Sequence, residues 1–281
     1  MRHHNFTALA AAGAIVALAA CSKTPAQEPA ETLQPVKFSI ETLAAEYGPL
    51  TKATGSDKIN TLAHKAIKPS APGHQYAVNA YTTEQLAALD LSALEVKLPA
   101  GDFTMYFVAG GKDTTDPLTW SSTEITMTDP RELFAGSVTG VNIQTAQEYS
   151  VTLERVTGAL ALNITDLASA PANFTKVKLA CDRPNIWNPV AGTFTGSNSA
   201  SVELTKEEIT AGEYKSVLPF SARTIQVQVY NGGTIVTTYS VSAAVYSNRK
   251  TIITGALFGG TGSFSVSVED TWGDDNPVNI Q

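Results

Sequence analysis

The residue with the clearest chemistry is Cys21, which follows an apolar, alanine-rich stretch. Arg2 supplies a positive start, and the stretch has the length of a secretory signal but is too short for a stable membrane span. It ends in Leu-Ala-Ala-Cys, where small residues fit a peptidase cleft and the cysteine thiol can accept a diacylglyceryl group. The sequence therefore predicts a lipoprotein signal at residues 1–20 and lipidation of Cys21. The alternative is ordinary secretion with a chance cysteine.

The segment after this cysteine is rich in proline, alanine, glutamate and glutamine. It has no apolar period, so residues 21–35 are predicted to form a flexible or partly polyproline tether. Two or more acyl chains hold a protein durably on a membrane, whereas one chain holds it weakly. Ser22 is compatible with sorting to the outer membrane, so we expect a lipid-anchored protein at the cell surface.

No other residues form a constellation that could carry out catalysis. Cys181 would be the only other cysteine, so no internal disulfide is possible, and its place in an alternating run favours a buried small hydrophobe over a reactive thiol. His64 and His74 lie near no second ligand at metal spacing, and we expect solvated or capping roles for both. The net charge of −7 argues against nucleic acid as a partner. The sequence predicts no enzyme, no metal and no cofactor.

Three tryptophans stand beside turn residues and leave two interpretations open. Trp120, Trp187 and Trp272 could stack on sugars, because flat indole faces match the C–H surfaces of pyranose rings. A tryptophan at the base of a loop can also simply pack over the end of a sandwich.

Alternating apolar residues indicate strands throughout the rest of the chain. A stretch at residues 43–73 lacks a clear pattern, and Thr82 with Gln85 forms a possible capping box that opens a short helix. A hairpin is expected across residues 99–102, and Asn-Gly-Gly at residues 231–233 is the strongest hairpin signal. The pattern predicts an all-β protein with two antiparallel β-sandwiches joined near residue 150.

The order of these elements resembles the fimbrial subunits of Bacteroidales, the lipoprotein-derived pilins and their FimB-like anchor lipoproteins of the type V pilus. The resemblance rests on Cys21 and on residues 76–81, 98–103, 106–110 and 149–156. It implies two transthyretin-like β-sandwich domains in tandem, at residues 36–150 and 151–281, and a role in a surface pilus.

Members of the family assemble by strand exchange, in which a neighbour's strand replaces an N-terminal strand that a protease removes. The resemblance makes residues 36–42 the candidate strand, with Val36, Phe38 and Ile40 as its anchors. Removal in relatives needs an arginine soon after this strand, and no arginine lies between Arg2 and Arg131. Lys52, Lys58, Lys65 and Lys68 are available to a lysine-cutting protease.

A second site is implied by the same resemblance. Asp-Thr-Thr can be an O-glycosylation acceptor in Bacteroidales, and the motif at residues 113–115 makes Thr114 the candidate residue.

The resulting hypothesis is a non-enzymatic structural subunit of a fimbria, most simply its lipid-anchored basal subunit. Its partners would be the membrane, through the lipid, and other fimbrial subunits, through donor-strand pairing. The alternatives are a surface glycan-binding lipoprotein that uses exposed tryptophans, and a shaft or tip pilin that proteolysis releases.

Overall fold

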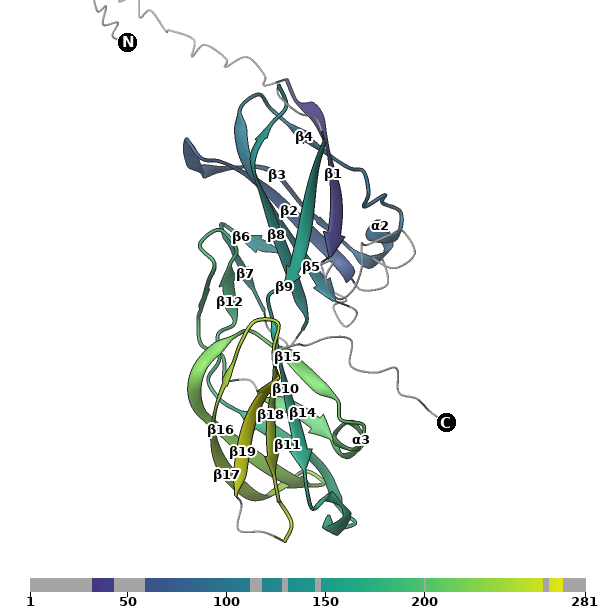
Figure 1. The fold of residues 1–281 in the computed structure, drawn as a ribbon, viewed down its shortest axis with the longest axis vertical. Coiled ribbons are helices and arrows are strands. Elements are labelled where there is room, and N and C mark those ends of the chain that lie inside the picture. The colour runs from purple at the N-terminus through teal and green to yellow at the C-terminus, as the bar shows by residue number, and fades with distance from the viewer. Residues whose placement is uncertain are drawn as a thin grey trace, which may run out of the picture. The chain divides into compact units, whose positions relative to one another are not determined.

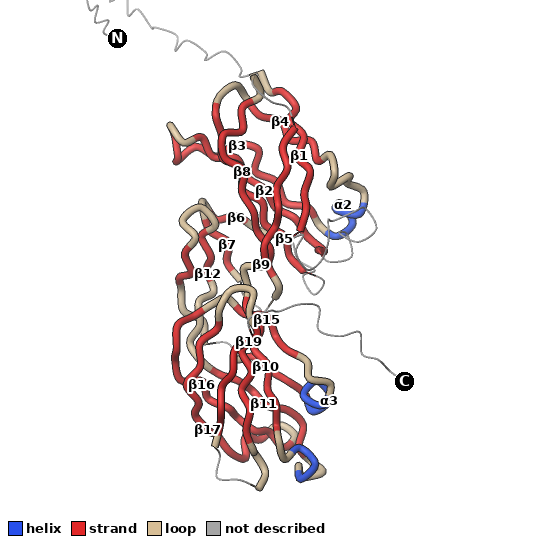
Figure 2. The backbone as a smooth tube through the Cα atoms, in the orientation of Figure 1, coloured by secondary structure: helices blue, strands red, loops and turns tan. Residues whose placement is uncertain are grey.

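The computed structural model describes residues 32–42, 59–111, 118–127, 131–144, 148–199, 201–259 and 263–269. These residues form strands with a few short helical turns (Figures 1 and 2). Pairing is antiparallel apart from two parallel pairs, β1 with β9 and β10 with β18. The all-β prediction with antiparallel sheets is therefore confirmed.

The first half of the described chain builds one seven-stranded sheet in the order β3-β2-β5-β8-β9-β1-β4. Two short strands, β6 and β7, lie outside it. The elements are β1 (Gln34–Thr42), β2 (Ile59–Lys68), β3 (Ala71–Tyr81), α2 (Thr83–Ala87), β4 (Leu94–Leu98), β5 (Asp102–Gly111), β6 (Trp120–Ser121), β7 (Glu124–Thr126), β8 (Leu133–Asn142) and β9 (Glu148–Arg155).

The second half builds two four-stranded sheets, β15-β10-β18-β19 and β14-β11-β16-β17. Its elements are β10 (Gly158–Ile164), η1 (Leu167–Ser169), β11 (Phe174–Ala180), β12 (Ile186–Asn188), β13 (Thr193–Thr195), β14 (Val202–Thr205), α3 (Lys206–Thr210), β15 (Tyr214–Val217), β16 (Phe220–Asn231), β17 (Thr234–Val245), β18 (Lys250–Gly255) and β19 (Phe264–Glu269).

The two halves repeat the same strand order. β3-β2-β5-β8 corresponds to β14-β11-β16-β17, and β9-β1-β4 corresponds to β18-β10-β15. The directions agree as well, because β1 and β10 each run parallel to one neighbour and antiparallel to the other. In this correspondence β1 takes the place of β10.

The halves differ in two places. In the first half, β8 and β9 pair through Phe134 with Arg155 and Ala135 with Glu154, which joins all seven strands into one sheet. In the second half, β19 instead pairs along the whole length of β18.

A small fourth sheet links the halves. It has the order β13-β12-β7-β6, and Trp187 of β12 pairs with Ile125 of β7.

Each half has its own hydrophobic cluster, and a third cluster lies under the small sheet. The first includes Phe38 and Phe107, the second includes Leu160 and Val227, and the third includes Trp187. The boundaries at residues 36–150 and 151–281 stay a prediction.

The two halves also repeat one helical turn. Thr82 begins α2 and Thr205 begins α3, and each forms a capping box with the residue three positions later, Gln85 or Glu208. The hydroxyl accepts the backbone N–H of that residue, whose side chain accepts the N–H of the threonine. The capping box of α2 is as predicted, whereas α3 was not expected.

The hairpin expected across residues 99–102 is wrong. β4 pairs with β1, while β5 pairs with β2 and β8, so these two strands do not pair with each other. Leu98 and Phe103, on either side of the turn, are both fully buried. The turn therefore carries the chain across the core rather than reversing it within one sheet.

The unpatterned stretch contains a strand, β2. From Thr61 to Ile67 every residue of β2 is buried, including His64 and Lys65. One face packs in the first cluster, through Leu62 and Ala66, and the other packs under the small sheet, through Ala63. A strand that is covered on both faces shows no alternation in its sequence, which explains the missed prediction.

The joint between β9 and β10 contains only two residues, Val156 and Thr157. Thr157 is fully buried; its hydroxyl accepts the N–H of Leu133 at 3.2 Å, and its carbonyl accepts the N–H of Asn248 at 2.9 Å. Arg155 donates to Glu132 at 2.5 Å. Strand β10 is therefore tied directly to the strand before it.

Candidate strand-complementation site

The candidate site is β1, which lies inside its sheet with a partner on each side. Residues 34–38 pair antiparallel with β4, and residues 37–42 pair parallel with β9. Both neighbours are distant from β1 in sequence. Without β1, β4 and β9 would each present an unpaired edge with open backbone donors and acceptors.

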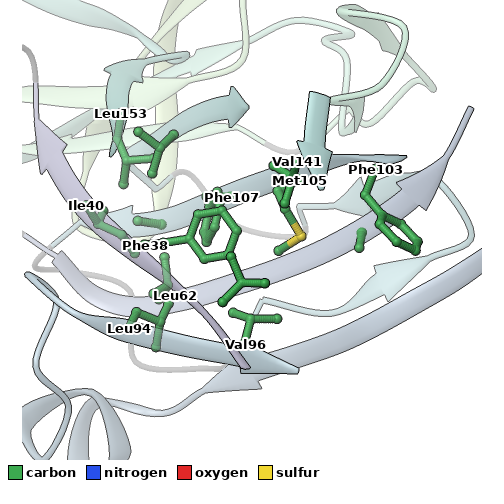
Figure 3. Packing of buried hydrophobic residues seen from close by; sticks show 14 of the residues in the cluster. Phe38, Ile40, Leu62, Leu94, Val96, Phe103, Met105, Phe107, Val141 and Leu153 are labelled. Carbon is green, nitrogen blue, oxygen red and sulfur yellow. The ribbon is translucent and has the colours of Figure 1, made fainter. Parts of the chain in front are cut away.

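The three predicted anchors are buried in the first cluster, and Figure 3 shows Phe38 and Ile40 among its other side chains. Val36 and Phe38 are 0% exposed and Ile40 is 1% exposed. The ring of Phe38 lies 5.1 Å from that of Phe107 and 5.7 Å from that of Tyr149, nearly parallel to the latter. Burial of such a side chain is worth about 1.5–3 kcal/mol, so the anchors contribute several kcal/mol together. Their role in strand exchange stays a prediction.

The buried histidine His64 packs next to Phe107, one of the rings that contacts Phe38. The ring of His64 lies 5.9 Å from Phe107, and its Nε2 lies 3.1 Å from the hydroxyl of Tyr81. Removal from water lowers the pKa of His64 to about 4, although a backbone hydrogen bond to Ala77 opposes the shift. The expected solvated or capping role for His64 is wrong, because β2 carries this residue through the core.

The strand is fixed at its end and beside its partner β9. The N–H of Ile40 donates to the carbonyl of Leu91 at 2.8 Å. The hydroxyl of Tyr149 accepts the N–H of Asn142 at 2.8 Å and donates to the carbonyl of the same residue at 3.2 Å. These contacts hold the ring that stacks on Phe38.

Three of the predicted residues, Cys21, Thr114 and Trp272, lie outside the described residues. Cys181 is a free, partly buried cysteine that packs against the second cluster, and burial raises the pKa of its thiol. In the part of the chain that the structure describes, no three His, Cys, Asp or Glu side chains gather to hold a metal ion. Among the same residues, no helix is long and apolar enough to cross a membrane.

The two described tryptophans, Trp120 and Trp187, both pack against the third hydrophobic cluster rather than extending into solvent. Trp187 is 5% exposed, and its ring stacks on Phe194 at 6.5 Å. The ammonium of Lys65 lies 4.2 Å from the ring centroid of Trp120, and this lysine also donates to the carbonyl of Ser122. Of the two interpretations of the tryptophans, packing holds for Trp187. Lys65 covers one face of Trp120.

Comparison with known proteins finds likeness in structure rather than in sequence. No protein-family model and no curated protein matches the chain. A candidate cell adhesion protein from Bacteroides uniformis is similar with a TM-score of 0.52 and 17% identity, over 84% of this chain and 98% of that one. Candidate polysaccharide-binding proteins from Bacteroides thetaiotaomicron are similar with a TM-score of 0.51 and 12% identity, over 85% and 98%.

Fimbrial proteins are also among the similar structures. The fimbrial anchor protein Mfa2 from Porphyromonas gingivalis has a TM-score of 0.47 and 11% identity, over 85% of this chain and 98% of that one. At such identities the likeness concerns the fold alone. The chain therefore shares its fold with a candidate cell adhesion protein and candidate polysaccharide-binding proteins of Bacteroides.

Proposed function

We propose that this chain is a non-enzymatic structural subunit of a cell-surface fimbria, held in the outer membrane by lipid on Cys21 at the base of the fibre. The observation that carries the proposal is the position of β1, which lies between β9 and the edge strand β4 with three buried anchors. A subunit that keeps this strand needs no donor strand to complete its own fold. It also keeps the lipid that precedes the strand.

The proposal includes two transthyretin-like β-sandwich domains in tandem, at residues 36–150 and 151–281. The repeated strand order of the two halves supports this division. So does the repeated capping box before the corresponding strands β4 and β15.

Retention of β1 is supported by the basic residues that follow it. No arginine lies between Arg2 and Arg131, so an arginine-directed protease has no site there. Lys65 is 0% exposed in the middle of β2 and is closed to a protease in the folded protein. Lys68, at the end of β2, is half-buried, and Lys52 and Lys58 lie outside the described residues.

The next subunit would join by adding a strand at an open sheet edge. In the seven-stranded sheet the two end strands are β3 and β4. β3 pairs irregularly, with two register shifts and a positive φ of 46° at Ala77, and such bulges discourage strand addition. β4 pairs regularly with β1, which favours its free edge as the receiving side.

Replacement of Cys21 tests the anchor role in fimbriated cells. In Cys21→Ser the lipid cannot attach, so we expect assembled fibres to be released into the medium, whereas native cells keep them. Cys181→Ser is the matched control, because this cysteine lies in the folded body and its loss leaves the lipid in place. Fibres that stay on Cys21→Ser cells as firmly as on native cells contradict the proposal.

The alternative of a shaft or tip pilin predicts a different result. A subunit that loses its first strand and its lipid during assembly would be found along the fibre or at its end, rather than at the cell surface. Immunogold labelling of the fibre separates the two roles, since the anchor is expected only where the fibre meets the cell.

A further inference from the structure

A cleft of about 360 Å³ opens on the outer face of β5, β8 and β9, and its lining residue Thr152 is the register partner of Glu41 in β1. One wall comes from β12 and the residue after it, in the second half of the chain. The lining residues are Tyr106, Ala135, Gly136, Ser137, Thr152, Glu154, Trp187 and Pro189.

The register of the strands brings the polar residues together. Tyr106 of β5 stands opposite Ser137 of β8, and Ala135 of β8 stands opposite Glu154 of β9. Thr152 lies two residues before Glu154, so both project from the same face of β9. The small sheet covers the adjoining part of this face, where Val108 and Ala135 pack in the third cluster.

Gly136 shapes the floor of the cleft. A Cβ atom at this position would lie 2.3 Å from the carbonyl oxygen of Thr152, a distance that no side chain can occupy. Glycine therefore allows β8 and β9 to approach closely here. Gly136 stands opposite Phe107, so a side chain here would point to the core face, whereas Ser137 and Thr152 project from the outer face.

The lining offers one phenol, two hydroxyls and one carboxylate for hydrogen bonds. Within the described residues, the side chains of Tyr106, Ser137, Thr152 and Glu154 form no hydrogen bond or ion pair with the rest of the protein. Burial raises the pKa of Tyr106, so its phenol stays a neutral donor at physiological pH. Among the residues that the structure describes, no lysine, arginine or histidine lines the cleft, which disfavours an anionic ligand.

We propose that this cleft is a binding site for a neutral oligosaccharide. Sugar hydroxyls would hydrogen-bond to Tyr106, Ser137, Thr152 and Glu154, while a C–H face of the sugar rests against Pro189. The volume is at the lower end of the range for small-ligand sites, about 300–1,000 Å³. This inference goes beyond the anchor function, which needs no ligand.

A peptide strand fits the cleft less well. The cleft lies on the face of the sheet, and β8 pairs with β5 on one side and with β9 on the other. An extended peptide could not add a backbone ladder at Phe134 and Ala135, where β8 is paired on both sides, because strand addition needs a free edge. A ligand that presents many hydroxyl groups matches the side chains that point outward from this face.

Binding can be tested with the purified chain from Cys21 onward, with Ser in place of Cys21. The probes are an array of neutral oligosaccharides built from mannose, galactose, fucose and N-acetylglucosamine, with sialylated and uronic-acid oligosaccharides beside them. We expect a neutral probe to bind, and Glu154→Gln and Tyr106→Phe each to weaken its binding by about tenfold in titration calorimetry. These variants change exposed or half-exposed polar atoms, so their melting temperatures should match the native one.

Glu148→Gln is the matched control, because Glu148 is another exposed carboxylate on β9 but does not line this cleft. It should leave binding unchanged, and Thr152→Ala should weaken it. The inference is overturned if no neutral probe binds, if acidic probes bind more tightly, or if binding survives in both Glu154→Gln and Tyr106→Phe. None of these outcomes bears on the anchor role, which the Cys21 variant tests in cells.

Discussion

Strands β1 and β10 occupy the same place in the two halves, but the chain holds them differently. β10 follows β9 after two residues, and the buried hydroxyl and carbonyl of Thr157 tie the joint to Leu133 and Asn248. β1 is separated from the next strand by residues 43–58 and has no connection to its neighbours β4 and β9 except through pairing. β1 is held in the sheet by hydrogen bonds, by buried side chains and by an exposed ion pair between Lys37 and Glu148 at 3.9 Å.

Because of this difference, another strand could replace β1 but could not replace β10. A separate peptide could fill the place of β1 without any change in the path of the remaining chain. The place of β10 cannot be filled in this way, because β10 continues β9. The first half is therefore the one in which strand exchange is physically possible, and the following experiments test that contrast.

The largest effect is expected from deletion of β1. A chain that begins at Ile59 loses the burial of Val36, Phe38 and Ile40, worth about 5–9 kcal/mol together. We expect its first half to lose hydrogen-exchange protection while the second half keeps it. A peptide of residues 32–42 should restore protection, and the same peptide with Phe38→Ser and Ile40→Ser should not. Full protection without any peptide would mean that β1 is dispensable.

A smaller effect is expected from single substitutions at corresponding positions of the two strands. By register, Phe38 of β1 corresponds to Leu160 of β10, and both are almost completely buried. Phe38→Ala should lower the free energy of unfolding of the first half by about 3–5 kcal/mol, and Leu160→Ala should lower that of the second by about 2–5 kcal/mol. Protection factors in each half report the two losses. Equal loss in both halves from either variant would contradict two separate cores.

Between pH 7 and 4, acid should weaken the first half through its buried histidine, whereas the low-pKa carboxyls of the second half, Asp166, Glu203 and Glu208, lose their stabilisation at lower pH. The pKa of His64 is about 4 when folded and 6.5 when unfolded, so folding favours the neutral ring. The stabilisation is complete above pH 6.5 and is lost as the pH falls through 4, by up to about 3 kcal/mol. Denaturation of the native chain and of His64→Leu between pH 7 and 4 should show a steeper decline in the native chain. Parallel declines would contradict the buried, neutral histidine.

The smallest effect is expected at the two capping boxes. Thr82→Ala and Thr205→Ala each remove one side-chain cap and should each cost about 1 kcal/mol. Similar losses in the free energy of unfolding would indicate that the capped turn stabilises both halves equally. A loss at only one position would mean that the repeat is one of geometry alone.

The sequence predicts those strands, turns and helices that are determined by residues close together in the chain. Strand β1 alternates because one of its faces is buried, and the β16–β17 hairpin follows from Asn-Gly-Gly, where Gly232 has a φ of 57°. α2 follows from the reciprocal bonds of Thr82 and Gln85. In each case the residues that determine the element lie within a few positions of one another.

Features that depend on distant parts of the chain were missed. β2 loses its alternation because two layers cover it, and the β4–β5 turn is shaped by the core that it crosses. The cleft at Glu154 combines four separate segments. Its only local signal is the outward-facing pair Thr152 and Glu154 on β9, which many exposed strands would share.

The most direct test of the central claim, that this subunit keeps both its strand and its lipid, is the intact mass of the protein isolated from its own cells. The account predicts a triacylated chain that begins at Cys21 and therefore still contains β1. A lipid-free chain that begins just after Lys52 or Lys58 would contradict it, and would make the protein part of the fibre rather than its base.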